Sequence, residues 1–137
     1  MNEADAVPYP VQIVADDRER ESGVIEALKE LDGVNVRVER LGLGDYKVDE
    51  WLLVERKTLP DLTLSIQSGR LFEQAQRLSS SPLRSIVILE GTSQDLAESG
   101  MRREAVQGAL ITLTLIFGLP ILRASLKTCL RDRRCRR

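Results

Sequence analysis

Residues 51–57 constrain this chain more than any other segment, because they end an apolar strand with charged side chains. Residues 51–54 are apolar, and Glu55, Arg56 and Lys57 follow them. Side chains alternate between the two faces of a strand, so Glu55 and Lys57 share a face and Arg56 points to the other. Because an unpaired charge is costly to bury, this pattern favours a site in which Glu55 and Lys57 meet a metal ion and a phosphate.

A second acid, Asp45, is expected beside Glu55. The strand predicted at 45–48 turns at 49–50 and pairs with the next strand, which brings the two acids together. Metal-dependent hydrolysis of a phosphodiester needs such a set, with carboxylates that hold Mg²⁺ and a lysine that positions or deprotonates water or stabilises the transition state. Taken alone, the spacing is weakly specific, and a surface hairpin with a salt bridge is the simpler explanation.

The chain contains no histidine, so imidazole is excluded as a base and as a metal ligand. Its two cysteines, Cys129 and Cys135, form neither a disulfide framework nor a metal motif. A metal site is therefore expected to consist of oxygen ligands, which favours Mg²⁺ or Mn²⁺.

Length and composition predict one globular domain. The chain has 137 residues, of which 42% are hydrophobic and 30% charged. We expect a flexible lead-in at 1–9, a domain at 10–124, and at 125–137 a basic tail that is either a short DNA-contacting helix or flexible. No signal peptide is visible, and residues 105–122 predict a buried helix and a strand rather than a membrane span. The chain is therefore expected in the cytoplasm, associated with the nucleoid if it is prokaryotic.

Hydrophobic periodicity and turn residues predict the order of the elements. Strands are expected at 11–15, 34–38, 45–48, 51–57, 84–89 and 121–124. Helices are expected at 24–31 with a Ser22 cap, from 58 onward, at 71–78 and at 103–117. The order β-α-β-β-β-α-α-β-α-β indicates an α/β sandwich on a mixed sheet.

Further polar residues lie where such a sheet would open to a ligand. The segment 16–19 (D-D-R-E) ends the first strand, although a solvated loop explains it equally well. Asp61 fits the third position of a capping box and could also contact the site. Arg70 and Gln74 could contact phosphate, support the cluster, or simply begin a solvated helix. Glu90 ends an apolar strand and could be only an exposed strand end.

Five motifs in this chain resemble those of a known family. They are D-D-R-E at 16–19, L-x-x-G-D-Y at 41–46, V-E-R-K-T-x-x-D at 54–61, S-I-x-x-G-R-L-x-x-Q at 65–74 and I-L-E-G at 88–91. Together they resemble the nuclease domain of the XPF/Hef-type structure-specific endonucleases, over about residues 11–124. The resemblance implies a restriction-endonuclease-like fold, of the PD-(D/E)XK type, with a mixed central sheet flanked by helices.

The resemblance also implies roles for the matching residues. The catalytic positions are Asp45, Glu55, Arg56, Lys57 and Asp61, with Asp45 and Glu55 as the metal ligands, and the supporting positions are Asp16, Arg18 and Glu19. The implied activity is that of a Mg²⁺-dependent (or Mn²⁺-dependent) endonuclease that cuts one DNA strand near a branch, such as a 3′ flap or fork. That activity belongs to DNA repair or replication-fork processing.

The resemblance implies a homodimer formed through the nuclease domain. The helix at 103–117 and the strand after it are candidates for the interface, because they are more apolar than a one-sided helix needs to be. Packing of this helix inside one monomer is the alternative. The sequence contains no P-loop, helicase domain or helix-hairpin-helix module, so a separate partner with such a module is also considered.

Two other functions remain open from the sequence. A non-catalytic DNA-binding scaffold subunit is one, although such subunits lose acids that this motif retains. A nuclease of the same fold that acts on RNA or on unbranched ends is the other.

Overall fold

The computed structural model describes residues 10–124, so the predictions for 1–9 and 125–137, including both cysteines, lie outside the described residues. The chain divides into two units, Met1–Val54 and Glu55–Arg137. Within 10–124, no helix is both long and apolar enough to cross a membrane.

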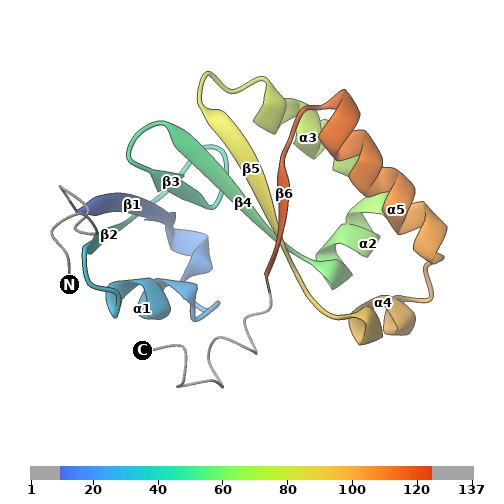
Figure 1. The fold of residues 1–137 in the computed structure, drawn as a ribbon, viewed down its shortest axis with the longest axis horizontal. Coiled ribbons are helices and arrows are strands. Elements are labelled where there is room, and N and C mark those ends of the chain that lie inside the picture. The colour runs from blue at the N-terminus through green and yellow to red at the C-terminus, as the bar shows by residue number, and fades with distance from the viewer. Residues whose placement is uncertain (1–9, 125–137) are drawn as a thin grey trace, which may run out of the picture. The chain divides into compact units, whose positions relative to one another are not determined.

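The sheet is mixed, as predicted. Its strands are β1 (Val11–Asp16), β2 (Val34–Glu39), β3 (Tyr46–Val48), β4 (Leu52–Thr58), β5 (Arg84–Glu90) and β6 (Ile121–Ala124). They follow the order β2-β1-β3-β4-β5-β6 (Figure 1). The β1–β2 and β5–β6 pairs are parallel, whereas β3 pairs antiparallel with both β1 and β4. Because β4 crosses the boundary at Val54, it contributes residues to both units.

In the first unit, helix α1 packs with β1 and β2. The β1 strand is buried from Ile13 to Asp16, and β2 alternates between half-buried and exposed residues, as its Val-x-Val-x-Val pattern predicts. Helix α1 (Val24–Lys29) is shorter than predicted, and its N-cap is Gly23, with φ of 83°. The prediction of a Ser22 cap was wrong by one position, although the Ser22 hydroxyl still accepts the Val24 N–H at 3.2 Å.

The hairpin between β3 and β4 turns at the predicted residues. Asp49 and Glu50 have φ of 47° and 62°, and Trp51 N–H donates to the Val48 carbonyl at 3.1 Å. Residues 49–51 connect the paired Val48 and Leu52, and the two left-handed residues occupy the first two positions of this connection. The turn therefore fixes the register in which Tyr46 faces Val54.

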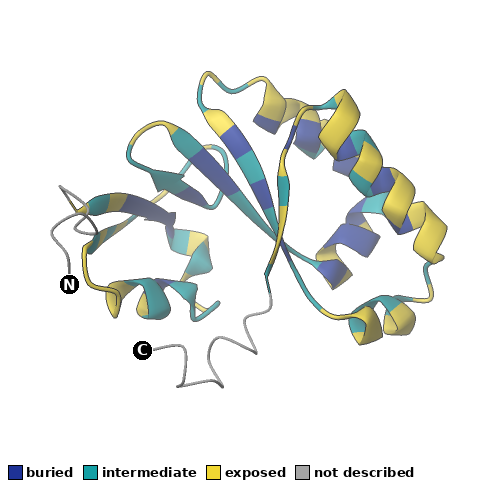
Figure 2. Cartoon of the chain, viewed as in Figure 1, coloured by how far each residue is buried: buried dark blue, intermediate teal, exposed yellow. Residues whose placement is uncertain are grey.

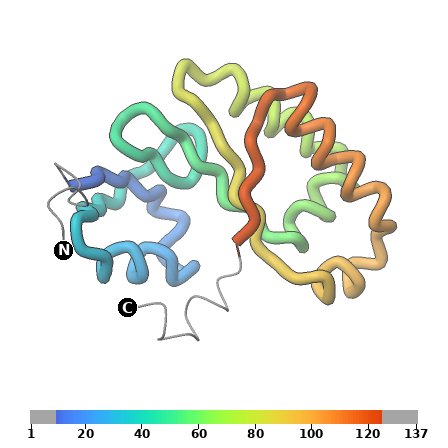
Figure 3. The backbone as a smooth tube through the Cα atoms, viewed as in Figure 1, coloured from blue at the N-terminus to red at the C-terminus, as the bar shows by residue number. Residues whose placement is uncertain are grey.

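In the second unit, three helices pack against one side of β5 and β6: α2 (Leu59–Gln67), α3 (Leu71–Ser79) and α5 (Arg103–Ile111) (Figures 1 and 3). The predicted start of α2 is confirmed, because the Thr58 hydroxyl accepts the Asp61 N–H at 3.2 Å. The buried side chains of these elements include Leu59, Leu62, Leu71, Ala75, Leu78, Val87, Leu89, Val106, Ala109, Leu113 and Leu119 (Figure 2).

One helix of this unit was not predicted. Helix α4 (Ser93–Ser99) begins with a capping box formed by Thr92 and Asp95, and none of its residues is buried. A helix without a buried apolar face leaves no hydrophobic period to detect, which is why the sequence pattern missed it.

The helix predicted at 103–117 is α5 followed by a wider π-helical turn at Thr112–Ile116. Leu113 is buried, whereas Ile111, Leu115 and Ile116 are 57%, 74% and 75% exposed. These apolar side chains therefore point outward, which contradicts the alternative of a helix packed on all sides within one monomer.

Candidate active site

Asp16, at the end of β1, organises the polar residues of the first unit. Its side chain is fully buried and accepts the Arg18 Nε at 2.6 Å, the Arg18 N–H at 3.2 Å and the Leu41 N–H at 2.8 Å. Arg18 also donates to the Leu41 carbonyl at 3.1 Å. Asp16 and Arg18 therefore hold the start of the loop that leads to Asp45.

Opposing effects act on the ionisation of Asp16. Burial raises its pKa, but the hydrogen bonds from Arg18 and from the Leu41 backbone, with the positive charge of Arg18, lower it more. The net pKa lies below the ordinary value, so the buried group is a carboxylate at neutral pH. The same contact raises the pKa of Arg18, to which the charge of Asp45 also contributes.

Asp45 is held through its backbone on both sides. Its N–H donates to the Val54 carbonyl and its carbonyl accepts the Asp16 N–H, each at 2.8 Å. The preceding Gly44 has φ of 75°, and a Cβ there would lie 3.3 Å from the Leu53 side chain. The glycine of the G-D-Y motif thus permits the close approach that places Asp45 at the start of β3.

Glu19, the third supporting residue, contacts the tyrosine of the same motif. Tyr46 is buried, and its hydroxyl donates to the Glu19 carboxylate at 2.8 Å. The first unit therefore brings Asp16, Arg18 and Glu19 around the segment that carries Asp45.

In the second unit, Glu55 and Lys57 line one small cavity of about 20 Å³ with Gln74 and apolar side chains of the surrounding core. Lys57 Nζ donates to Gln74 Oε1 at 2.9 Å. Of the three interpretations of Gln74, the contact with Lys57 favours support of the cluster. Arg70, in contrast, is exposed, and its Nε donates to the Ser68 hydroxyl at 3.1 Å.

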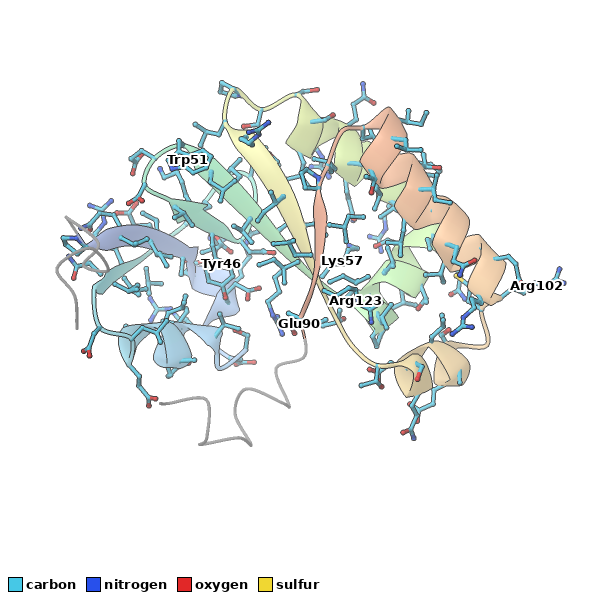
Figure 4. The ribbon with its side chains drawn as sticks, in the orientation of Figure 1. Tyr46, Trp51, Lys57, Glu90, Arg102 and Arg123 are labelled. Carbon is cyan, nitrogen blue, oxygen red and sulfur yellow. The ribbon has the colours of Figure 1, made fainter. Side chains whose placement is uncertain are left out.

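Arg56 makes contacts that differ from those of its two neighbours. Its guanidinium pairs with Glu90, through Nε to Oε1 at 2.6 Å and a terminal nitrogen to Oε2 at 2.7 Å. Glu90 is only 12% exposed, so it is not the exposed strand end that the sequence allowed. Figure 4 labels Lys57, Glu90 and Arg123 where β4, β5 and β6 end.

Asp61 lies in the first turn of α2. Its side chain is exposed, and its backbone N–H completes the Thr58 cap. The capping interpretation is therefore correct for the backbone, and the exposed carboxylate is accessible to a ligand.

The donor set of the motif fits magnesium. Among residues 10–124, no three His, Cys, Asp or Glu side chains gather into a group that could hold a metal. Magnesium characteristically uses one or two carboxylates, retains several waters and takes further oxygens from substrate phosphate. The motif offers one such carboxylate in each unit, Asp45 in the first and Glu55 in the second, and both side chains are partly exposed.

Comparison with known proteins identifies the family. The model of the ERCC4 domain matches residues 15–127. The chain is 36% identical over 111 residues to the "3'-flap repair endonuclease Xpf" of Saccharolobus solfataricus, covering 81% of this chain and 47% of that relative. It is 34% identical over 113 residues to the "DNA repair endonuclease XPF" of Cricetulus griseus, covering 77% of this chain and 12% of that relative. The chain therefore spans about half, or less, of the length of these relatives.

A solved structure agrees with this assignment. XPF from Aeropyrum pernix, in complex with DNA, matches with a TM-score of 0.73 and 32% identity, covering 83% of this chain and 56% of that one. The match confirms the predicted restriction-endonuclease-like fold with a mixed sheet flanked by helices. The chain therefore belongs to the ERCC4-domain family, as a nuclease domain of the XPF type.

Proposed function

We propose that this chain is the catalytic domain of a metal-dependent endonuclease that hydrolyses DNA phosphodiester bonds near branches, such as a 3′ flap or a fork. One observation carries the proposal. A chain of this family retains Asp45, Glu55, Lys57 and Asp61, and within it Glu55 and Lys57 line the same cavity. A pseudo-nuclease has no need of these groups.

Each residue of the set has a distinct task in the proposed reaction. Asp45 and Glu55 hold Mg²⁺ or Mn²⁺, which when bound lowers the pKa of a water and offsets charge on the phosphoryl oxygens. Lys57 places its ammonium group beside the developing negative charge. Asp61 orients water or a phosphate contact from the first turn of α2.

Neighbouring residues keep the proposed catalytic groups in place. Lys57 Nζ donates one hydrogen bond to the Gln74 side-chain carbonyl oxygen at 2.9 Å, and its other two N–H groups can contact water or phosphate. Arg70 is an exposed cation at the start of α3 and suits a phosphate contact outside the reacting bond.

The relatives support DNA as the substrate. One carries 3′-flap repair in its name, and a structural neighbour is described in complex with DNA. We extend both properties to this chain and place its activity in DNA repair or fork processing in the cytoplasm. A separate helix-hairpin-helix or helicase partner is the proposed source of further branch specificity.

A homodimer is the proposed assembly. The outward apolar side chains are Ile111, Leu115, Ile116 and, on β6, Leu122, which is 54% exposed. Exposed apolar patches of this kind commonly mark protein interfaces. A second copy of the same nuclease domain is the proposed partner.

The test is cleavage of end-labelled 3′-flap, fork, duplex and single-stranded DNA in Mg²⁺, Mn²⁺ or EDTA. The wild-type chain is compared with Asp45→Asn and with Asp32→Asn, an exposed acid of the same unit. We expect metal-dependent cutting of the flap or fork that Asp45→Asn reduces at least about 100-fold and Asp32→Asn leaves intact. If every protein binds DNA and none cuts it, a scaffold subunit is favoured. Preferential cutting of the duplex or single-stranded DNA would favour a nuclease of the same fold that acts on unbranched ends.

A further inference from the structure

The ion pair between Arg56 and Glu90 is largely withdrawn from solvent. The two side chains are 19% and 12% exposed, and two nitrogens of the guanidinium meet the two carboxylate oxygens at 2.6 and 2.7 Å. A planar fork of this kind fixes direction as well as distance. Two of the five N–H donors of Arg56 are directed at Glu90, so the direction of the guanidinium is set by a residue of another strand.

A second contact joins the same two strand ends. Gly91, directly after Glu90, has φ of 140°, and a Cβ there would lie 2.9 Å from the side chain of Leu59. Leu59 is the first residue after β4 and is buried. The end of β5 therefore contacts the junction of β4 and α2, and the ion pair joins the two strands one residue earlier in β5 and three residues earlier in β4.

The residues on either side of Arg56 are the proposed catalytic ones. Glu55 and Lys57 line the cavity with Gln74, whereas Arg56 reaches Glu90 instead. One peptide unit connects the guanidinium-bearing residue to each of them. Any shift of Arg56 therefore moves both groups, and a displacement of about 1 Å in reacting groups can cost about 100-fold in rate.

We propose that Glu90 is a positioning residue, which clamps Arg56 and thereby fixes the end of β4 that carries Glu55 and Lys57. On this view Arg56 also acts through its neighbours and does not touch the scissile phosphate. The proposal rests on the nuclease function proposed above and adds to it a residue on a different strand.

Removal of one partner and removal of both have different consequences. Loss of one partner removes this counter-charge from a largely buried group, which is destabilising. Replacement of both by apolar side chains of similar volume is often neutral, because no charge remains to be desolvated. If the ion pair only fixes the end of β4, the double variant retains most of its activity. If Arg56 binds substrate, the double variant loses activity because the guanidinium is gone.

The experiment compares Arg56→Met, Glu90→Leu and the double variant with the wild type. The readouts are kcat and KM on a 3′-flap substrate, the unfolding temperature, and amide hydrogen exchange at residues 55–58 in metal-free protein. Glu90→Gln and Arg56→Lys are milder versions for use if a single variant does not fold. Glu39→Leu is the control, because its ion pair with Arg37 is 3.6 Å long and exposed.

We expect each single variant to lower kcat by about 10- to 100-fold with little change in KM, and to speed exchange at 55–58. The double variant should recover slow exchange and most of kcat. A double variant that folds and exchanges slowly, yet cuts as poorly as Arg56→Met, would overturn the proposal, because Arg56 would then contact substrate. Unchanged exchange and kcat in Glu90→Leu would overturn it as well.

The exchange measurement separates this proposal from the function on which it rests. If the wild type cuts no substrate, the nuclease proposal fails on that result alone. Amide hydrogen exchange at residues 55–58 in the metal-free proteins then tests the positioning role of Glu90. Fast exchange in both single variants and slow exchange in the double variant would support that role, and fast exchange in the double variant would contradict it.

Discussion

Asp16 is a charged residue at a fully buried position, and its contacts explain why it is stable there. Three hydrogen bonds reach its two oxygens from Arg18 and Leu41, so the carboxylate remains satisfied without water. The sequence predicted Asp16 only as a supporting member of the site. Its observed contacts are with the loop before Asp45, which makes it a structural support for that acid.

Asp16→Asn is predicted to lower the free energy of unfolding by about 1–2 kcal/mol at neutral pH. Because the pKa of Asp16 in the folded protein lies below the ordinary value of 3.8, the carboxylate stabilises the fold above that pH, and this stabilisation is lost as the pH falls through the folded pKa. The difference between wild type and variant, measured by urea unfolding from pH 7 to pH 3, should therefore shrink at low pH. A difference independent of pH, or an equal loss in the exposed Asp32→Asn control, would contradict this.

At the scale of elements, Gly91 decides how β5 passes α2. Its φ of 140° is unfavourable for any residue with a side chain, and an added Cβ would lie within 2.9 Å of Leu59. The position of the neighbouring Glu90 depends on how β5 packs against Leu59, because the same strand end carries the carboxylate that pairs with Arg56. The glycine in I-L-E-G is thus required by the packing of two elements.

Gly91→Ala is predicted to lower the free energy of unfolding by about 2–4 kcal/mol, through backbone strain and the clash with Leu59. The matched control is Gly108→Ala in α5, where an added Cβ meets nothing within 4 Å. That change should be neutral or raise stability by about 0.5–1 kcal/mol, because alanine favours the helix. Urea unfolding measures the stability of both variants. A Gly91→Ala variant as stable as the wild type would contradict the prediction, because the end of β5 would then be able to shift away from Leu59.

At the scale of the whole molecule, the outward apolar residues of the second unit are the feature that the fold leaves unexplained. The side chains of Leu115 and Ile116 are about three-quarters exposed, although their neighbour Leu113 is buried in the core. The wider π-helical turn at Thr112–Ile116 carries all three. Association of two copies would remove this surface from water.

Leu115→Glu is predicted to weaken self-association at least about tenfold in Kd, because a carboxylate would be buried at the interface. Sedimentation velocity over a concentration series measures the effect, with Gln107→Glu, an exposed polar position of α5, as the control. The unfolding midpoint of the monomer should hardly change. A wild-type chain that stays monomeric at the highest concentration would show the dimer prediction to be wrong.

The elements of this protein were largely determined by local sequence. Alternation of valines placed β2, the 49–50 turn placed the β3–β4 hairpin, and Thr58 with Pro60 placed the start of α2. These signals act between near neighbours, so they can be detected without the fold. Helix α4 was missed because none of its residues is buried, so no hydrophobic period follows its capping box. The cap of α1 was misplaced by one position because its N-cap is a glycine with no side-chain hydrogen bond.

The candidate catalytic residues were also evident from the sequence, since a charged triplet at the end of an apolar strand is locally unusual. Which groups hold these residues, and the supporting Asp16, was decided only by the tertiary structure. Glu90 lies 34 positions from Arg56, Gln74 lies 17 from Lys57, and Leu41 lies 25 from Asp16. Such partners meet because strands and helices pack, and no local periodicity records which distant donor will reach which acceptor.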